Sequence, residues 1–431
     1  MSDVARLLAG DPDLFAGPTA SRALGWLRHP EVYGGAWIDE TARRLPRRHE
    51  RTIVVGMGGS SSPARLLNRV GEALEVLDTS NPDSVAATDF AGATVVAASK
   101  SGTTIEVQTL LAHALVSGLE PEDLVVVTDP GTTLAALGAS LGATVVLGDP
   151  RTGGRYSALS PFGLVPALYA GWSAADLGDL LRENALDEAT AARALARAEE
   201  VELHEGWGTL TLDGDPALDG AALWLEQLVA ETTGKQGRGV VPLAGAGPRH
   251  DPGRIMEDHL TAVWLARRLG VDPFDQPDVD GAKRSVFARL GASALAAPAG
   301  PEGACELAVA LAAPGYRTLQ IYGPLAIASQ IGALRAAVAA RFGPTTANLG
   351  PRYLHSTGQL HKGGPALGAV QVLVRPQSTP RRIQGRRYTF HDLHRAQADA
   401  DLAALVARGR PVARVEVDDL AEATQRLVAA S

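Results

Sequence analysis

The sequence contains a single cysteine among its 431 residues, Cys305. An intrachain disulfide is therefore impossible, and a metal site built on paired cysteines is excluded. Basic residues are outnumbered by acidic ones, 40 to 48, which gives a net charge of -8 at neutral pH. A chain with this balance is a poor non-specific binder of nucleic acid, so any anionic ligand must be held by local groups.

Long apolar stretches are also absent. No run of about twenty apolar residues, the length that spans a bilayer, occurs anywhere in the sequence. The segment Met1–Phe15 carries acidic residues where a signal peptide carries cations, and it lacks an apolar core. We therefore expect a soluble, cytoplasmic protein that has neither a membrane nor a nucleic acid as its partner.

The chain is too long for one ordinary hydrophobic core, so two domains or more are expected. Short valine-rich runs alternate with segments of helical length over residues 51–172, which is typical of a doubly wound parallel sheet with helices on both faces. Residues 173–375 show a weaker mixed pattern, which predicts a helical bridge and a second α/β domain. We interpret residues 1–50 as a helical lead-in and residues 376–431 as a C-terminal tail that begins with an arginine-rich connector.

The clearest motif is Ser99–Thr104, where an apolar run breaks into small and cationic residues before a helical pattern resumes. Such a strand–loop–helix corner points backbone N–H groups and the positive end of a helix at one spot, so it favours a bound phosphate or sulfate. An ordinary hydroxyl-capped helix is the alternative, because serine and threonine cap helices without any ligand. A cap needs one hydroxyl, however, whereas four occur here within six residues.

A second loop, Gly56–Ser62 with the sequence GMGGSSS, also follows a predicted strand. Ligands of doubly wound folds bind at the carboxyl ends of the strands, so the two loops can face one pocket. This loop also permits a dinucleotide-binding fingerprint, with Asp78 as the acid that binds the ribose. Ser61 stands in place of the third glycine, and a second hydroxyl-rich loop is not part of that fingerprint, so the phosphate pocket is the favoured interpretation.

Two further segments carry side chains suited to acid–base chemistry. Arg155 follows a glycine pair after the last apolar run of the first domain, which favours a cation that faces the pocket. Gln227 and Glu231 are four residues apart and so share a helix face. Glu231 stands where a Thr-Thr-Gly sequence ends the helix, which makes it a candidate general base, although most such glutamates are only solvated.

Two histidines, His355 and His361, lie in a glycine-rich, irregular stretch. A histidine in a loop is more often functional than one in a core. Zinc is not predicted there, since no carboxylate stands beside the pair at the spacing of a zinc site.

Together, these motifs resemble those of the phosphoglucose isomerase family, whose members are built from two sugar-isomerase (SIS) domains. The family's glycine-serine loop, phosphate loop, GGRYS signature, QxxxESxGK signature and FDQ segment are matched, in that order, by Gly56–Ser60, Ser99–Thr104, Gly153–Leu164, Gln227–Lys235 and Phe274–Lys283. Five motifs in family order are hard to obtain by chance. The resemblance implies two SIS-type doubly wound domains.

One motif departs from the family order. Classical members carry their HSxxQ segment between the catalytic glutamate and lysine, whereas here His355–Gln359 follows Lys283. This stretch and the arginine-rich tail resemble the isomerase half of fused transaldolase/phosphoglucose isomerase proteins. The alternatives to His355 as the histidine of the site are His250, His259 and His361.

The resemblance implies an aldose–ketose isomerase that interconverts glucose 6-phosphate and fructose 6-phosphate through a cis-enediolate. Glu231 would be the base, Arg155 would stabilise the enediolate oxygen, and Lys283 and His355 would open the sugar ring. The implied ligands of the phosphate are Ser60, Ser99, Lys100, Ser101, Thr103 and Thr104, and those of the sugar are Gly59, Gln227 and Gln276.

No cofactor and no metal are expected, because the substrate's own carbonyl acidifies the proton. In the family the active site lies at a dimer interface and takes its histidine from the partner chain, so the resemblance implies a homodimer with a shared active site. Three alternatives remain open: an isomerase of mannose 6-phosphate or a modified hexose phosphate, a non-catalytic SIS module that binds a phosphosugar, and an NAD-dependent dehydrogenase.

Overall fold

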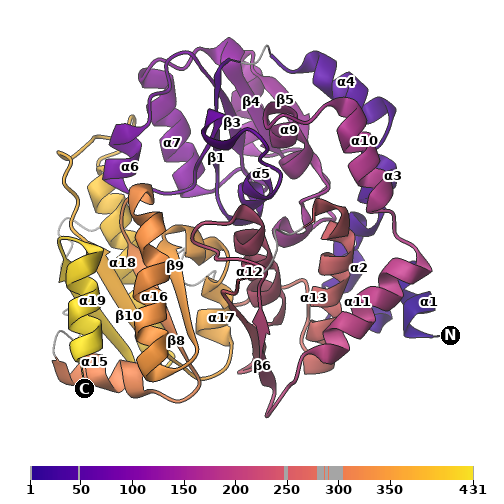
Figure 1. Ribbon diagram of the computed structural model, residues 1–431. Coiled ribbons are helices and arrows are strands. Elements are labelled where there is room, and N and C mark those ends of the chain that lie inside the picture. The colour runs from indigo at the N-terminus through magenta and orange to yellow at the C-terminus, as the bar shows by residue number, and fades with distance from the viewer. Residues whose placement is uncertain are drawn as a thin grey trace.

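The computed structural model in Figure 1 describes residues 2–46, 49–246, 251–278 and 304–430, together with residues 286 and 290. The N-terminal part contains four short helices, which are α1 (Asp3–Leu8), α2 (Ala20–Ala23), α3 (His29–Val32) and α4 (Ala36–Arg44). Leu7, Trp26 and Ile38 from this lead-in are buried in the same apolar cluster as the first sheet. The lead-in is therefore part of the main core.

Five parallel strands form the first sheet, in the order β2-β1-β3-β4-β5. The strands are β1 (Arg51–Gly56), β2 (Leu74–Leu77), β3 (Ala93–Ala98), β4 (Leu124–Thr128) and β5 (Thr144–Leu147). β1 pairs with β3 in register up to Gly56 and Ala98, so both strands end at the same edge. Valine and alanine dominate β3 and β4 because both faces of the sheet are buried, which leaves no place for an alternating polar pattern.

Helices cover both faces of this sheet. Val54 packs on one side with α5 (Ser62–Leu66) and α9 (Pro161–Tyr169). Its neighbour Ile53 packs on the other side, which is covered by α6 (Pro82–Ala87), α7 (Ile105–Val116), α8 (Thr133–Leu141) and α18 (Phe390–Val406). The predicted doubly wound α/β architecture is confirmed.

Two helices, α10 (Ala174–Glu183) and α11 (Glu188–Glu200), lead from the first sheet into the middle of the chain. They are followed by β6 (Trp207–Thr211), α12 (Gly220–Thr233), β7 (Gly239–Leu243) and α13 (Ile255–Leu269), with β6 and β7 forming a parallel pair. Helix α12 lies near the centre of the molecule in Figure 1, and its side chains from Ala221 to Thr233 are buried. Because α12 carries charged and amide side chains, these must find partners inside the protein.

Four parallel strands form the second sheet, in the order β11-β10-β8-β9. They are β8 (Tyr316–Tyr322), β9 (Thr345–Gly350), β10 (Leu367–Val374) and β11 (Val412–Val417). One face is covered by α15 (Ala304–Ala312), α16 (Ala328–Phe342) and α19 (Leu420–Ala429), and the other by α17 (Gly358–Gly363) and the second half of α18. The second unit is therefore also a parallel sheet with helices on both faces, but it extends beyond the predicted boundary at residue 375, because β11 and α19 lie in the segment interpreted as a tail.

Among the described residues, one helical stretch, Leu325–Phe342, is long and apolar enough to cross a membrane by length and composition alone. Its buried residues Ile331, Leu334 and Val338 belong to the apolar cluster of the second sheet. The stretch thus occupies the position of a covering helix in this fold.

Candidate active site

A cavity of about 340 Å³ lies where the carboxyl ends of the first sheet's strands meet helix α12 and the segment that follows β9. This is the edge at which doubly wound folds bind ligands. The cavity is lined by most of the side chains proposed from the sequence, namely Gly59, Ser60, Lys100, Ser101, Thr104, Arg155, Gln227, Glu231, Gln276 and His355. Of the others, Ser99 is buried and does not line the cavity, Thr103 is exposed, and Lys283 lies outside the described residues.

The hydroxyl-rich loop stands immediately before α7. The hydroxyls of Ser99 and Thr104 lie 2.9 Å apart, and those of Ser101 and Thr103 lie 3.0 Å apart. Thr104 occupies the N-cap position of α7, but its side chain makes no capping hydrogen bond to the first helical turn. The simple hydroxyl-capped helix is therefore not what the structure shows, and the N–H groups at this helix end remain suited to an anion.

The ammonium group of Lys100 is held by protein partners. Its Nζ lies 2.7 and 2.6 Å from the two carboxylate oxygens of Asp129, and it donates to the carbonyl oxygen of Asp149 at 2.7 Å. Burial lowers the pKa of Lys100. The resemblance implies that Lys100 is a ligand of the phosphate, whereas in the structure its ammonium group fastens the Ser99–Thr104 loop to the segments that follow β4 and β5.

Two glycines allow three loops to converge on the cavity. A Cβ atom at Gly59 would collide with the carbonyl oxygen of Gly154, and one at Gly58, where φ is +52°, would collide with the carbonyl oxygen of His355. Ser157 closes the same junction by donating a hydrogen bond to the carbonyl oxygen of Gly59 at 2.7 Å. The glycine-serine loop can therefore approach both neighbours only because it lacks side chains there.

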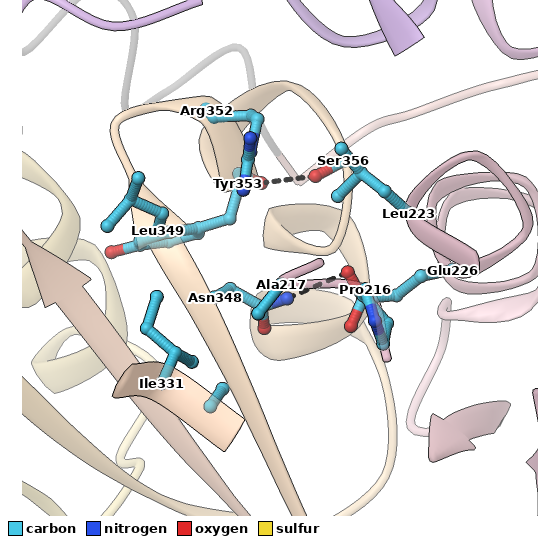
Figure 2. Close-up of a pocket in the computed structure, with 11 residues that line it drawn as sticks. Pro216, Ala217, Leu223, Glu226, Ile331, Asn348, Leu349, Arg352, Tyr353 and Ser356 are labelled. Atoms are coloured by element: carbon cyan, nitrogen blue, oxygen red, sulfur yellow. Dashed lines mark hydrogen bonds between the residues drawn. The ribbon is translucent and has the colours of Figure 1, made fainter. Parts of the chain in front are cut away.

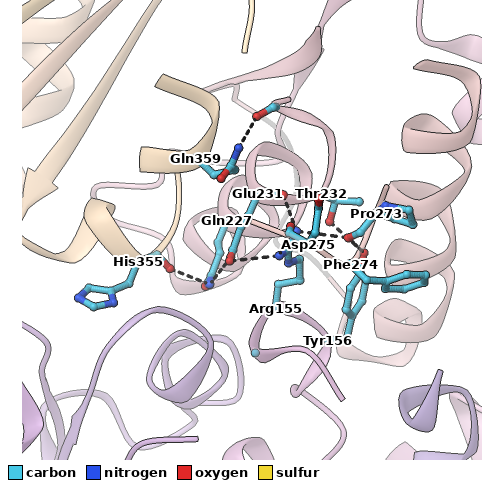
Figure 3. Close-up of polar contacts among 12 residues, drawn as sticks. Arg155, Tyr156, Gln227, Glu231, Thr232, Pro273, Phe274, Asp275, His355 and Gln359 are labelled. Carbon is cyan, nitrogen blue, oxygen red and sulfur yellow. Dashed lines mark hydrogen bonds and ion pairs between the residues drawn. The ribbon is translucent and has the colours of Figure 1, made fainter. Parts of the chain in front are cut away.

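Glu231, near the end of α12, is held between two side chains (Figure 3). Arg155 Nη2 lies 3.4 Å from Oε1, and Gln227 Nε2 donates to Oε2 at 3.1 Å. The Arg155 and Glu231 side chains are only 3% and 9% exposed, so they form a buried charge pair. Arg155 also donates to the main-chain carbonyl oxygens of Glu231, Pro273 and Asp275. A guanidinium with this many acceptors presents a positive charge at a fixed position.

Lys235, which was not assigned a role from the sequence, contacts the turn that holds Arg155. Its buried ammonium lies 2.8 Å from the carboxylate of Asp275 and also donates to the carbonyl oxygen of Asp272. Burial lowers the pKa of Lys235 to about 8, and the charge of Arg155 acts in the same direction. Lys235 thus fixes the 272–275 turn, whose carbonyl oxygens orient Arg155.

His355 approaches the cavity by its main chain as well as its ring. Its carbonyl oxygen accepts a hydrogen bond from Gln227 at 3.1 Å, while its ring is turned away from Glu231, as Figure 3 shows. His355 Nε2 lies 2.8 Å from Oε1 of Glu106, a buried residue in the first turn of α7. The same oxygen accepts from Gln397 of α18 at 2.6 Å. In this single chain, His355 and Glu231 line one cavity, whereas the resemblance implies a histidine supplied by a partner chain.

Neither of the other two described histidines proposed for the site lines the cavity. His259 is buried against the rings of Trp26, Tyr156 and Trp224, and burial lowers its pKa to about 3. His361 is also fully buried, beside Thr318 Oγ1 at 3.1 Å, and burial lowers its pKa well below the usual value. His250 lies outside the described residues.

Asp78, the acid of the dinucleotide alternative, is already engaged. One oxygen lies 3.0 Å from Arg65 and the other 3.5 Å from Arg352. Burial alone would raise the pKa of Asp78, but the two arginines lower it. A fully buried, doubly paired carboxylate is not free to bind a ribose, so the structure gives the dinucleotide alternative no support. Within the described part of the chain, no group of three His, Cys, Asp or Glu side chains is placed to hold a metal ion.

A second, much smaller cavity of about 10 Å³ shares Ser356 with the first (Figure 2). It is lined by Glu226, whose Oε2 accepts a hydrogen bond from Asn348 of β9 at 2.8 Å. Burial raises the pKa of Glu226 to about 7. A space of this size holds one water molecule at most, so it is a structural cavity and no substrate fits there.

The fold and the cavity of about 340 Å³ define a class of protein: a parallel α/β protein in which a hydroxyl-rich loop, a buried carboxylate and guanidinium, and a partly exposed histidine line one cavity. Comparison of sequences makes this assignment more specific. The chain is a relative of the glucose-6-phosphate isomerases, and the family resemblance seen in its motifs is confirmed. It is 27% identical over 305 residues to the enzyme so named in Parabacteroides distasonis, a match that covers 60% of this chain and 68% of that protein.

Two further relatives carry the same name. A protein from Thermus thermophilus is 29% identical over 302 residues, which is 61% of this chain and 71% of that protein. The one from Symbiobacterium thermophilum is 30% identical over 304 residues, or 59% and 65% of the two chains. No family model matches the sequence. The crystal structure of a Chlamydia trachomatis glucose-6-phosphate isomerase aligns with a TM-score of 0.48 at 16% identity, over 67% of this chain and 78% of that one.

Proposed function

We propose that this protein is an isomerase that interconverts glucose 6-phosphate and fructose 6-phosphate. The observation that carries the proposal is the position of Glu231, whose carboxylate lines the same cavity as the phosphate loop and is held between Arg155 and Gln227. The sequence relatives, which are named glucose-6-phosphate isomerases, support an isomerase of sugar phosphates.

The position of Glu231 supports a role in proton transfer. Aldose–ketose interconversion moves one proton between C2 and C1 of the open-chain sugar, and a single carboxylate can accept and return it. In the proposed mechanism Glu231 is that base. Arg155, fixed by three carbonyl oxygens, stabilises the negative charge that develops on the enediolate oxygen, where an immobile cation is most effective.

The phosphate would bind between the glycine-serine loop and the N-terminus of α7, where Ser60, Ser101 and Thr104 line the cavity. The Ser99 and Thr104 hydroxyls, now bonded to each other, can rotate to donate to phosphate oxygens. In this proposal Lys100 acts by holding the loop against Asp129. Gly59, Gln227 and Gln276 are placed along the remaining wall, where they would contact the sugar.

Ring opening requires a proton to move between the ring oxygen and O1. We assign this step to His355, whose ring is oriented by Glu106, together with Lys283. Lys283 enters the proposal from its motif alone, because it lies outside the described residues. The homodimer implied by the family resemblance stays a prediction, and the cavity already contains a histidine of its own chain.

A coupled assay on glucose 6-phosphate, mannose 6-phosphate and other hexose 6-phosphates tests the proposal. We expect turnover of glucose 6-phosphate that is abolished or strongly reduced in Glu231→Gln, with phosphosugar binding retained. Turnover of mannose 6-phosphate alone would change the substrate assignment. Binding of phosphosugars without turnover of any member of the panel would favour the non-catalytic binding module and overturn the enzyme proposal.

A further inference from the structure

The connector between β10 and α18 is a strongly basic, exposed segment that the proposed mechanism leaves unused. Over seven residues it carries four arginines in a chain with a net charge of -8, and all four are exposed: Arg381, Arg382, Arg386 and Arg387. Among the described residues, none of the four forms an ion pair with a carboxylate, whereas most arginines elsewhere in the fold have such a partner.

Two carboxylates of this region, Asp83 and Asp392, accept hydrogen bonds from other groups, and among the described residues neither forms an ion pair with these arginines. Asp83 accepts hydrogen bonds from the main-chain N–H groups of Gln377 and Ser378. Asp392 accepts from the N–H and the hydroxyl of Thr389, where it completes the capping box of α18. The arginine side chains are therefore left to face solvent.

The connector is also held in a fixed place. Ile383 is buried among the apolar side chains of α7 and α18, and the ring of His391 contacts the carbonyl oxygen of Ser378 at 3.0 Å. An isolated bridge pairs Arg382 with Thr389. In Figure 1 the connector passes over the same side of the first sheet as α6 and α7. A fixed backbone keeps the positive charges at one position on the surface.

One side chain links this basic segment to the phosphate loop. Gln108 of α7 donates to the carbonyl oxygen of Gly102, within the loop, at 3.3 Å. The other end of the same amide, Oε1, accepts from Arg386 at 3.3 Å. A single glutamine thus separates Arg386 from the loop that lines the cavity.

We propose that the four arginines form a capture surface that attracts the dianionic phosphate of the substrate and raises its rate of association with the cavity. This inference rests on the proposed function, in that the ligand is a sugar phosphate. The protein as a whole repels a dianion, so a local positive field beside the loop is needed for fast capture. Its reach is about 10 Å at 0.1 M salt, so the effect is largest at low ionic strength.

The test measures association of a hexitol 6-phosphate, which has no carbonyl and cannot be isomerised. Stopped-flow tryptophan fluorescence or competition would follow its binding to the wild type, to Arg386→Gln/Arg387→Gln, and to a matched control. The control is Arg43→Gln/Arg44→Gln, an adjacent exposed pair on α4 that makes the same change in net charge on the opposite side of the molecule in Figure 1.

We expect the connector variant to associate about threefold to tenfold more slowly than the wild type at low ionic strength, with the difference vanishing at high salt and kcat unchanged. The control should behave as the wild type. Equal rates for all three proteins, or an equal loss in both variants, would overturn the inference. If the hexitol phosphate shows the expected pattern but no hexose phosphate is isomerised, the proposed function fails while the capture surface stands. If isomerisation is normal but the hexitol phosphate does not bind the wild type, the capture surface fails.

Discussion

Glu106 Oε1 and His355 Nε2 lie 2.8 Å apart although the residues are 249 positions apart in the sequence. Glu106 follows the phosphate loop by two residues, and its Oε1 also accepts from Gln397 of α18. One carboxylate oxygen therefore connects the loop that would hold the phosphate, the segment that would open the ring and a helix of the C-terminal region. In the proposed mechanism Glu106 is a positioning residue, because it acts through His355.

The first prediction concerns this pair. Glu106→Gln removes the charge that orients the His355 ring, so turnover of a cyclic hexose 6-phosphate should fall by about tenfold or more, within the range that positioned acid–base groups contribute. An aldose phosphate too short to close a ring should be isomerised at nearly the wild-type rate, because it needs no ring opening. Glu122→Gln, at an exposed site, is the control. An equal loss on both substrates would contradict the assignment and indicate a general structural effect.

The second prediction follows the proton. If Glu231 carries it from C2 to C1, a C2-deuterated substrate should show partial transfer of deuterium to C1, since a shielded carboxylate returns part of its label before exchange with water. Glu231→Gln should lower the rate by a factor of about 10²–10⁴. Glu226→Gln on the same helix is a matched control, because Glu226 is equally buried but lines the smaller cavity. Near-normal turnover in Glu231→Gln would place the base elsewhere.

The third prediction distinguishes the hydroxyls of the phosphate loop. Replacing Ser99 and Thr104 together by alanine should weaken binding of every phosphosugar by roughly 1–3 kcal/mol, because hydrogen bonds to a charged group are lost. Thr103→Ala should have a smaller effect, since Thr103 is exposed, whereas the Ser99 hydroxyl contacts Thr104, which lines the cavity. Calorimetry with inorganic phosphate and with a hexose 6-phosphate measures the affinity of each variant. Unchanged affinity in the double variant would rule out this loop as the phosphate site.

The fourth prediction is a pH dependence of stability. Burial raises the pKa of Glu226 to about 7, above its unfolded value, so the folded state holds this proton more tightly than the unfolded chain. The stabilisation is complete below the unfolded pKa and is lost as the pH rises towards 7. A glutamine at position 226 does not titrate, so the Glu226→Gln variant does not lose this stability as the pH rises. The free energy of unfolding of the variant, taken relative to that of the wild type, should therefore increase by about 2 kcal/mol between pH 5 and pH 7. Denaturant unfolding at both pH values measures the difference, and a pH-independent difference would contradict it.

Much of the fold could be predicted because its strands are buried on both faces. The unbroken valine runs of β3 and β4 have no other common interpretation between helical segments. β9, with the sequence TTANLG, gave no such signal, because it lacks a valine or isoleucine run and because asparagine and glycine are typical of turns and loops. It is nevertheless buried along its whole length, and the side-chain N–H of Asn348 finds its partner in Glu226 of α12. Local composition cannot reveal a strand whose polar groups are paired across the chain.

The candidate site was predictable to the extent that motif residues follow strands of one sheet, which brings their loops to one edge. The partners of these residues were not predictable. Lys100 pairs with Asp129, 29 positions away, and this contact changes its proposed role from phosphate ligand to loop support. Glu106 could have been suspected from its place just after the phosphate loop, but its contact with His355 depends on the packing of the two halves.

Helix α18 follows a strand of the second sheet, yet its first half packs on the first sheet through Leu393 and Ala396, and its second half packs on the second sheet through Leu402 and Leu405. A fragment that ends before this helix would leave apolar surface uncovered on both sheets and remove Gln397 from Glu106. The two halves of this chain are therefore not interchangeable modules. A chimaera that takes either half from a relative has to take a matching α18 with it, or it inherits two incomplete cores.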